Sequence, residues 1–226
     1  MTGTARLDQV FRLIEPGFLR SIAQGNIRTP TLYFHPNPLL RRTFWMRLWF
    51  IHRAMLRLRD RGGECLDFGG GSGVFLPTLA THFSHVTCID LDPREALQVR
   101  DEYKLTNVSI DRADITDAQY SDGKFDAIVA ADVLEHFADL GLPVRRIRQW
   151  LAADGLLFTS LPTENWMYTT LRAVFRIKKP ADHYHTSQEV ETFLTRSGFT
   201  PVNRWFVPLG LPIAPLFSIT TWRKTQ

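Results

Sequence analysis

The feature that most constrains the fold of this chain is a glycine-rich turn that follows a short apolar run. Residues 64–68 read Glu-Cys-Leu-Asp-Phe, and four glycines fall within residues 69–73. A helix-like stretch, residues 74–83, comes next. A strand, a glycine turn and a helix in this order let a ligand sit over the N-terminus of the helix. Glycine lets the backbone turn sharply and approach that ligand closely, because it has no Cβ.

Two acids near this turn indicate the class of ligand. Val74 stands where the dinucleotide fingerprint Gly-x-Gly-x-x-Gly has its last glycine, which disfavours a nicotinamide dehydrogenase. Asp67, directly before the turn, would repel a pyrophosphate and attract an ammonium group. Asp90 ends the next strand-like run, 21 residues after Gly69, where an acid can bind a ribose diol. A ligand with an amino group, a carboxylate and a ribose fits both acids, and S-adenosylmethionine is such a ligand.

The positive charge of the chain is concentrated in one segment. The 226 residues carry a formal net charge of +4, whereas residues 41–61 alone hold seven arginines and one acid. The rest of the chain is slightly acidic, which argues against a uniformly basic nucleic-acid surface. Residues 42–59 are predicted to form a helix, because apolar residues recur there at spacings of four and three: Phe44, Leu48, Ile51, Met55 and Leu58.

Two interpretations of this helix remain open. Its arginines lie mainly away from the apolar stripe, so the helix can pack on a core and keep a solvated basic face. Alternatively, with Trp45 and Trp49 beside the stripe, it can meet a membrane surface or an anionic, apolar acceptor. Two further segments favour the second interpretation: the basic and apolar stretch Trp166–Lys179 and the uncharged loop Pro208–Pro215.

Cysteine usage and hydropathy bear on the compartment. Cys65 and Cys88 both fall inside predicted strands, so a disulfide framework is not expected and a reducing compartment fits. Residues 1–10 lack the apolar core of a signal peptide. No uninterrupted apolar run reaches ~18 residues, the length that a membrane-spanning helix needs. The sequence therefore predicts a cytoplasmic protein that can associate with a membrane surface.

From residue 64 onward, strand-like and helix-like segments alternate, which is typical of an α/β fold with a parallel sheet. Before it, residues 4–24 form a predicted helical region that Pro16-Gly17 interrupts. Thr186 or Ser187 caps the last predicted helix, which ends at Ser197-Gly198. The other predicted helices span residues 93–104 and 142–151, the latter closed by Asp154-Gly155, and the predicted strands span residues 64–68, 86–90, 108–112, 125–130, 156–160, 201–207 and 216–223.

Four motifs, in order, resemble those of class I S-adenosylmethionine-dependent methyltransferases, especially the small-molecule branch that includes the ubiquinone-biosynthesis type. They are LDFGGGSG at 66–73, IDLD at 89–92, ADI at 113–115 and DVLEH at 132–136. The resemblance runs from residue 64 to the C-terminus. It implies a Rossmann-like, doubly wound seven-stranded sheet of order 3-2-1-4-5-7-6, with the last strand antiparallel and an N-terminal helical extension. It divides the chain into a helical cap that selects the acceptor, residues 1–61, and a methyltransferase domain, residues 62–226.

The resemblance also implies roles at the cofactor site. Asp67 would orient the methionine amino group, and Asp90 would accept hydrogen bonds from the ribose hydroxyls. Asp114 would accept a hydrogen bond from the adenine amino group. Each of these acids can instead serve a turn or a cap. Gly69 and Gly71 would bring the backbone against the methionine portion, Leu91 and Ile115 would contact the adenine ring, and Ala131 would contact the cofactor from the end of the fourth strand.

Histidines supply the candidate catalytic groups. Methyl transfer by direct displacement depends mainly on alignment and on the exclusion of water, so it needs no catalytic triad. An oxygen acceptor usually needs a base, which contributes about 10²–10⁴-fold, and His136 is the favoured candidate because it follows the fourth strand. It can instead open a helix and bond locally. His183 and His185 alternate about Tyr184, so they point the same way in an extended chain, where they can flank the acceptor or fix the loop.

No metal is predicted. Asp132, Glu135, His136 and one loop histidine offer oxygen and nitrogen ligands that can share a divalent ion. Their spacing in the sequence does not enforce such a site, so the prediction leaves it out.

The predicted function is S-adenosylmethionine-dependent transfer of a methyl group to a small or lipid-like acceptor, with oxygen or nitrogen as the acceptor atom. An RNA methyltransferase and a non-catalytic S-adenosylmethionine-binding partner protein are the alternatives. The Asn/Asp-Pro-Pro-aromatic motif of base-amino methylation is absent after the fourth strand, where Ala131-Asp132-Val133 stands, so nucleic acid is disfavoured as a partner. The N-terminal third matches no motif of the family, so the sequence identifies neither the acceptor nor the oligomeric state.

Overall fold

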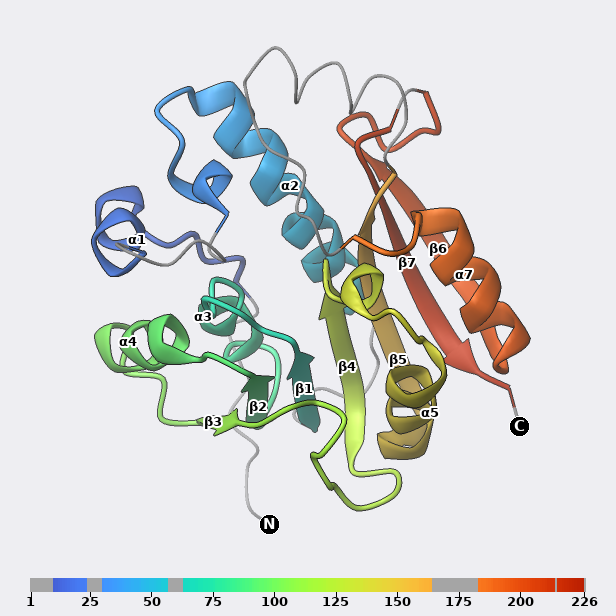
Figure 1. Cartoon of the computed structure of the whole chain (residues 1–226). Coiled ribbons are helices and arrows are strands. Elements are labelled where there is room, and N and C mark those ends of the chain that lie inside the picture. Colours follow the sequence, from blue (N-terminus) through green and yellow to red (C-terminus); the bar gives the residue numbers. More distant parts are fainter. Residues whose placement is uncertain (1–9, 24–29, 57–62, 164–182, 214, 226) are drawn as a thin grey trace.

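The computed structural model describes residues 10–23, 30–56, 63–163, 183–213 and 215–225 (Figure 1). Its helices are α1 (Pro16–Ile22), η1 (Thr31–Phe34), α2 (Pro38–Met55), α3 (Leu76–Leu79), α4 (Arg94–Glu102), η2 (Leu134–His136), α5 (Gly141–Trp150) and α7 (Ser187–Arg196). Its strands are β1 (Glu64–Phe68), β2 (His85–Asp90), β3 (Val108–Arg112), β4 (Phe125–Ala131), β5 (Leu151–Pro162), β6 (Phe199–Val207) and β7 (Phe217–Lys224).

The strands form one sheet in the order β3-β2-β1-β4-β5-β7-β6, which confirms the predicted fold class. Neighbouring strands from β3 to β5 pair in parallel, whereas β7 pairs antiparallel with both β5 and β6. The carboxyl ends of the parallel strands lie at the upper edge of the sheet in Figure 1. The chain order reverses between β1 and β4, and the crevice beyond that point is where open α/β sheets bind ligands.

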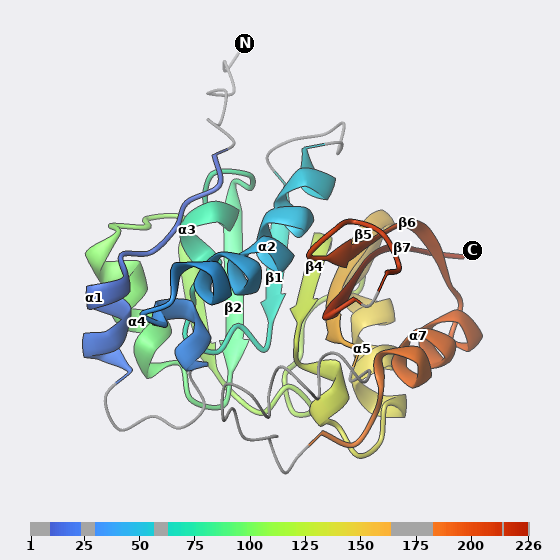
Figure 2. The same ribbon diagram turned by 90° about the horizontal axis from the view of Figure 1, so that it is seen from above.

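Each face of the sheet has its own hydrophobic core, because side chains alternate between the faces along every strand. In β1, Cys65 packs in one core, with residues of α1, η1, α2, α3 and α4. Leu66 and Phe68 pack in the other, with residues of η2, α5 and α7. Seen from above, α2 and α7 accordingly cover opposite faces of the sheet (Figure 2). The N-terminal helices therefore share a core with the sheet.

The N-terminal segment differs from its prediction. Residues 10–15 are not helical, and Pro16 begins α1 where an interruption was predicted. Proline fits the first position of a helix, where the missing N–H would have no intrahelical partner. The Glu15 carboxylate caps this end by accepting hydrogen bonds from the amides of Gly17 and Phe18, which lowers the Glu15 pKa. The predicted helical residues 4–9 and 24 lie outside the described residues.

Helix α2 begins four residues before its predicted start, because Asn37 caps it and accepts a hydrogen bond from the amide of Leu39. Its predicted apolar stripe is buried at Phe44, Leu48, Ile51 and Met55. Residues 57–59 of the predicted helix, and Leu58 with them, lie outside the described part of the chain.

Two further helix boundaries differ from their predictions. The stretch after the glycine turn is helical only at α3, because the residues that follow form tighter i→i+3 turns, from Thr81 to Thr78 and from His82 to Leu79. Helix α5 ends at Trp150, and Asp154-Gly155 lies inside β5 rather than closing the helix. The strand starts early because Leu151 pairs with Phe125, ahead of a register shift.

Candidate active site

The glycine turn lies at the carboxyl end of β1, and two of its glycines have distinct reasons to lack a side chain. Gly69 has φ +71°, and an added Cβ would lie 2.4 Å from Cγ2 of Val133, in the segment after β4. Gly71 has φ +52°, and an added Cβ would meet nothing within 4 Å. Gly69 is thus required by packing, whereas Gly71 leaves open space above the turn, where a ligand can approach the backbone.

Asp67 lies under this turn and is nearly inaccessible, with 4% of its surface exposed. Burial, and then the charge of nearby Asp90, raises the pKa of the Asp67 carboxyl to about 7. A buried carboxyl group with a raised pKa is stabilised in its charged form by any cation that binds beside it. The site is therefore suited to an ammonium group.

Asp90 ends β2 and has two backbone partners. Its Oδ2 accepts a hydrogen bond from the amide of Gly71 at 2.9 Å, and its Oδ1 accepts one from the amide of Asp92 at 2.9 Å. The carboxylate therefore shapes the glycine turn directly, whatever its role toward a ligand. Leu91 follows it with 51% of its surface exposed, which leaves an apolar side chain available beside the acid.

Asp114 follows β3, so the three predicted cofactor acids lie at or just past the carboxyl ends of three adjacent strands. Its Oδ1 accepts hydrogen bonds from the amide and the hydroxyl of Thr116, and these bonds lower the pKa of Asp114. The residue is exposed, whereas Ile115 is buried in the core beneath it. The turn role is thus present in the structure, and the adenine role of Asp114 stays a prediction.

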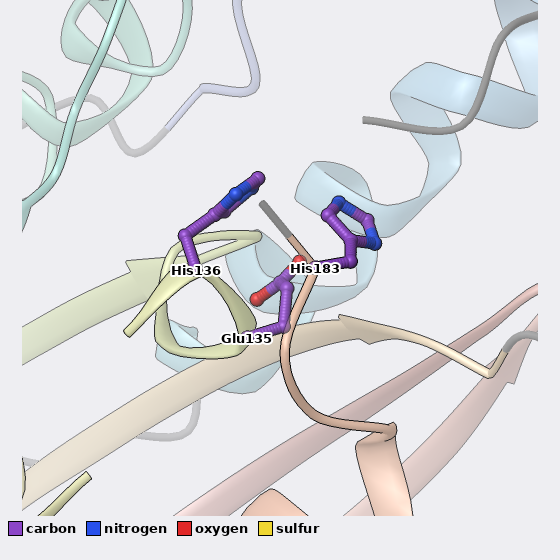
Figure 3. A group of neighbouring side chains, drawn as sticks. All are labelled: Glu135, His136 and His183. Carbon is purple, nitrogen blue, oxygen red and sulfur yellow. The ribbon is translucent and has the colours of Figure 1, made fainter. Parts of the chain in front are cut away.

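Beyond the last residue of β4, Ala131, the chain enters the turn η2 and forms a compact group of titratable side chains. One ligand atom from each of Glu135, His136 and His183 lies within 4.8 Å of the others. Glu135 is buried, and the two imidazole rings meet edge to face with centroids 4.6 Å apart. Figure 3 shows the three side chains converging from η2 and from the segment before α7. The amide of Tyr184 donates to the carbonyl of Glu135 at 2.9 Å and so brings His183 to the group.

His185 is not part of this group, and its predicted place beside the acceptor stays a prediction. It lines a groove along α7 together with Leu140, Thr192, Phe193 and Arg196. Thr186, the residue after His185, caps α7 in a reciprocal capping box with Glu189, so His185 lies directly before that helix. His185 and His136 thus belong to different features of the described structure.

Arg47 is a residue of this edge that sequence reasoning missed. The prediction placed the arginines of the helix on its solvated side, yet Arg47 is 2% exposed and its guanidinium pairs with Asp132. A signal was present, because Arg47 falls one helical turn after Phe44 and one before Ile51, within the buried stripe. The sequence could not predict the partner of Arg47, because only the tertiary fold brings Asp132 next to α2.

The chain is similar in sequence to known methyltransferases. A family model described as a methyltransferase domain matches residues 41–203. An (S)-coclaurine N-methyltransferase of Thalictrum flavum is 26% identical over 162 residues, covering 70% of this chain and 44% of the relative. A ubiquinone biosynthesis O-methyltransferase of Azorhizobium caulinodans is 28% identical over 126 residues, covering 51% of this chain and 50% of the relative. The chain thus matches about half the length of these curated relatives.

A solved structure shows the same fold over nearly its whole length. The N-methyltransferase NodS of Bradyrhizobium japonicum, crystallised with S-adenosyl-L-homocysteine, superposes with a TM-score of 0.68. The superposition covers 92% of this chain and 99% of NodS at 22% sequence identity. At this level of identity the likeness concerns the fold.

Proposed function

Since this chain belongs to the S-adenosylmethionine-dependent methyltransferase family, we propose that it transfers a methyl group to a small, largely apolar acceptor at the carboxyl edge between β1 and β4. The observation that carries the proposal is the arrangement of Asp67, Asp90 and Asp114 at the ends of three adjacent strands, with Asp90 hydrogen-bonded to Gly71, above which there is open space. These groups fit an ammonium, a ribose diol and an adenine amino group in that order.

The residues that would hold the methyl donor follow from this fit. Asp67 would bind the ammonium group, and the backbone at Gly69 and Gly71 would border the methionine portion. Asp90 and Asp114 would accept hydrogen bonds from the ribose and the adenine. The side chains of Leu91, Ile115 and Ala131 would provide apolar contacts. Bound S-adenosylmethionine supplies a methyl group on a positively charged sulfur, and the protein's task is to align the acceptor with it and to exclude water.

We propose that His136 removes the proton from the acceptor. It lies beyond the end of β4 on the same edge as the glycine turn, and its ring meets that of His183. The buried carboxyl group of Glu135, in the same turn, has an oxygen within 4.8 Å of a ring nitrogen of His136 and of one of His183.

Replacement of His136 tests this role. We expect His136→Gln to lower kcat by about 10²-fold, the contribution typical of a general base, while the Kd for S-adenosylhomocysteine stays unchanged. The measurement is a product assay across a panel of long-chain amines and alkylphenols, together with calorimetry. His185→Gln is the matched control, because His185 lies in the separate groove along α7. Equal losses in the two variants would contradict the assignment.

The same three side chains favour a second role for this group, a divalent cation site. Two imidazoles and one carboxylate within 4.8 Å form a donor set that suits zinc, manganese or iron. Asp132, which the sequence grouped with these ligands, is paired with Arg47 instead. Turnover that survives treatment with EDTA would favour proton transfer by His136 alone, whereas turnover that is lost and then restored by one divalent metal would favour the cation site.

The acceptor is inferred from an exposed apolar face beside the site, which we name the loop-209 face. It consists of Leu209, Leu211 and Ile213, with exposed fractions of 64%, 57% and 61%, and of Trp49 on α2. The two parts adjoin, since an added Cβ at Gly210 would lie 3.9 Å from the ring of Phe50.

The loop follows β6 at the carboxyl edge of the sheet, and Arg53 lies over the Trp49 ring and adds positive charge. We propose that this face contacts an anionic lipid surface and admits a lipid-like acceptor.

Two sequence expectations about lipid contact change. Trp45 was grouped with Trp49 as a lipid contact, but it is buried, and its indole N–H donates to the carbonyl of Tyr33 at 3.2 Å. The basic stretch Trp166–Lys179 lies outside the described residues. Within the described part of the chain, no helix is long and apolar enough to cross a bilayer. Any membrane contact by this part is therefore proposed at the surface.

Vesicle binding tests the loop-209 face. We expect the triple variant Leu209→Ser, Leu211→Ser, Ile213→Ser to lose at least about tenfold in affinity for mixed phosphatidylcholine–phosphatidylglycerol vesicles, because each large apolar side chain contributes about 1.5–3 kcal/mol when fully buried. Sedimentation with vesicles measures this, and Leu97→Ser, an exposed leucine on α4, is the control. Equal binding by all three proteins would remove the lipid surface from the proposal, and binding to RNA with a steep salt dependence would favour the RNA alternative.

A further inference from the structure

Arg47 is the most deeply buried arginine among the described residues, and it lies on the N-terminal helix α2. Only 2% of its surface is exposed. A guanidinium taken out of water is costly unless it is paired and hydrogen-bonded. Its presence in the core therefore requires specific partners, and those partners show what the residue does.

The partners come from three separate parts of the chain. Nη1 lies 2.8 Å from Oδ2 of Asp132, and Nη2 donates to the hydroxyl of Tyr33 in η1. The planar group also lies over the ring of Phe44, 4.1 Å from its centroid, and near the rings of Tyr33 and Phe217. Ion pairing, hydrogen bonding and aromatic contact together fix this side chain in one orientation.

Asp132 is the residue through which Arg47 reaches the site. It follows β4 directly and has φ +53°, which is uncommon for any residue other than glycine. Its amide donates to the carbonyl of Ser160 and its Oδ1 accepts from the Ser160 hydroxyl, both at 2.8 Å. Such a backbone conformation persists only where several contacts hold it, and the ion pair with Arg47 is one of the contacts seen here.

The conformation of Asp132 sets the course of the segment that follows. Val133, the next residue, packs so closely on Gly69 that a Cβ there would clash. The turn η2 comes next and carries Glu135 and His136. Residues 132–136 therefore connect the glycine turn, where the donor would bind, with the group around His136.

We infer that Arg47 is a positioning residue: through Asp132 it holds residues 132–136 in the geometry that the donor site and His136 require. This inference rests on the proposed function of that edge. It makes α2 a working part of the methyl-transfer site rather than only a cap that selects the acceptor.

The experiment compares Arg47→Met, Asp132→Asn and the double variant. Arg47→Met leaves the partly exposed Asp132 carboxylate without its ion pair, and Asp132→Asn leaves the buried Arg47 guanidinium without one, so each change lowers the Tm. The double variant removes both charges and recovers most of the Tm. We measure Tm, the calorimetric Kd for S-adenosylhomocysteine and amide hydrogen exchange of residues 130–138. Arg42→Met, at an exposed position on the same helix, is the control.

In the double variant we expect the amide hydrogen exchange rates of residues 130–138 to rise about tenfold, although the Tm recovers. We also expect the Kd for S-adenosylhomocysteine to increase about tenfold. A double variant with exchange and affinity equal to those of the wild type would overturn the inference and leave the pair with a structural role only. Asp132→Asn and the double variant keep the experiment decisive if Arg47→Met does not fold. A wild-type protein that does not bind S-adenosylhomocysteine would defeat the proposed function, and hydrogen exchange would still decide the role of Arg47.

Discussion

Asp90→Ala is expected to weaken binding of S-adenosylmethionine by about 10²-fold or more. The change would remove an acceptor for the ribose hydroxyls, and a lost hydrogen bond to a charged group costs about 1.5–3 kcal/mol. It would also free the amide of Gly71, which donates to Oδ2 of Asp90 at 2.9 Å and thereby sets the glycine turn. The two losses add in the same direction, so this position should be among the most sensitive in the chain. Calorimetric titration with S-adenosylmethionine measures the effect.

A second ligand separates the two contributions. The 3′-deoxyribose analogue of S-adenosylhomocysteine lacks one hydroxyl that Asp90 would bind, so the wild type should bind it more weakly than the parent compound. In Asp90→Ala this preference should vanish, because the two perturbations share one interaction. Asp92→Asn is the control, since the Asp92 carboxylate is directed to Arg94 on the outside of the turn. A preference for the parent compound that persists in Asp90→Ala would limit Asp90 to shaping the turn.

The sequence was sufficient to predict the sheet and its cofactor edge. Strands β1 and β3 have the predicted bounds, and Asp67, Asp90 and Asp114 come together because the carboxyl ends of parallel strands share one edge. Local patterns predict the positions of these strands, because an apolar run, a turn and an acid recur in β1, β2 and β3, whereas the resemblance to the family implied the order of the sheet. The cofactor roles of the three acids are predictions, and the structure adds turn contacts for Asp90 and Asp114.

What the sequence could not predict depends on contacts between distant segments. Arg47 was assigned to a solvated face because the arginines lie mainly on the side of the helix away from the apolar stripe, and its burial depends on its contacts with Asp132 and Tyr33. His183 reaches His136 through one backbone hydrogen bond, from Tyr184 to Glu135. His185 lines the groove along α7 instead. No periodicity or spacing encodes such pairings, so the group around His136 was less predictable than the acids at the ends of β1, β2 and β3.

Asp67 should make the affinity for S-adenosylmethionine and the stability of the free protein depend on pH in opposite directions. Because burial raises its pKa to about 7, the carboxyl is protonated below neutrality and would pair with the ligand's ammonium only after ionising. Affinity should therefore rise from pH 6 to 7.5. At pH 7, binding should release about half a proton, which calorimetry in phosphate and in Tris detects through their different ionisation enthalpies.

The stability of the ligand-free protein follows from the same pKa. The folded protein holds this proton up to about pH 7, whereas the unfolded chain loses it near the ordinary value of 3.8. Stability from this group is therefore complete below pH 3.8 and is lost as the pH rises to 7, by an amount on the order of 4 kcal/mol. Asp67→Asn cannot ionise, so it should unfold at a higher urea concentration than the wild type at pH 8 while binding S-adenosylmethionine poorly. Asp101→Asn, at an exposed acid on α4, should change neither property. An Asp67→Asn variant that is less stable than the wild type at pH 8 would contradict this prediction, because it would show that the ionised Asp67 carboxylate stabilises the fold.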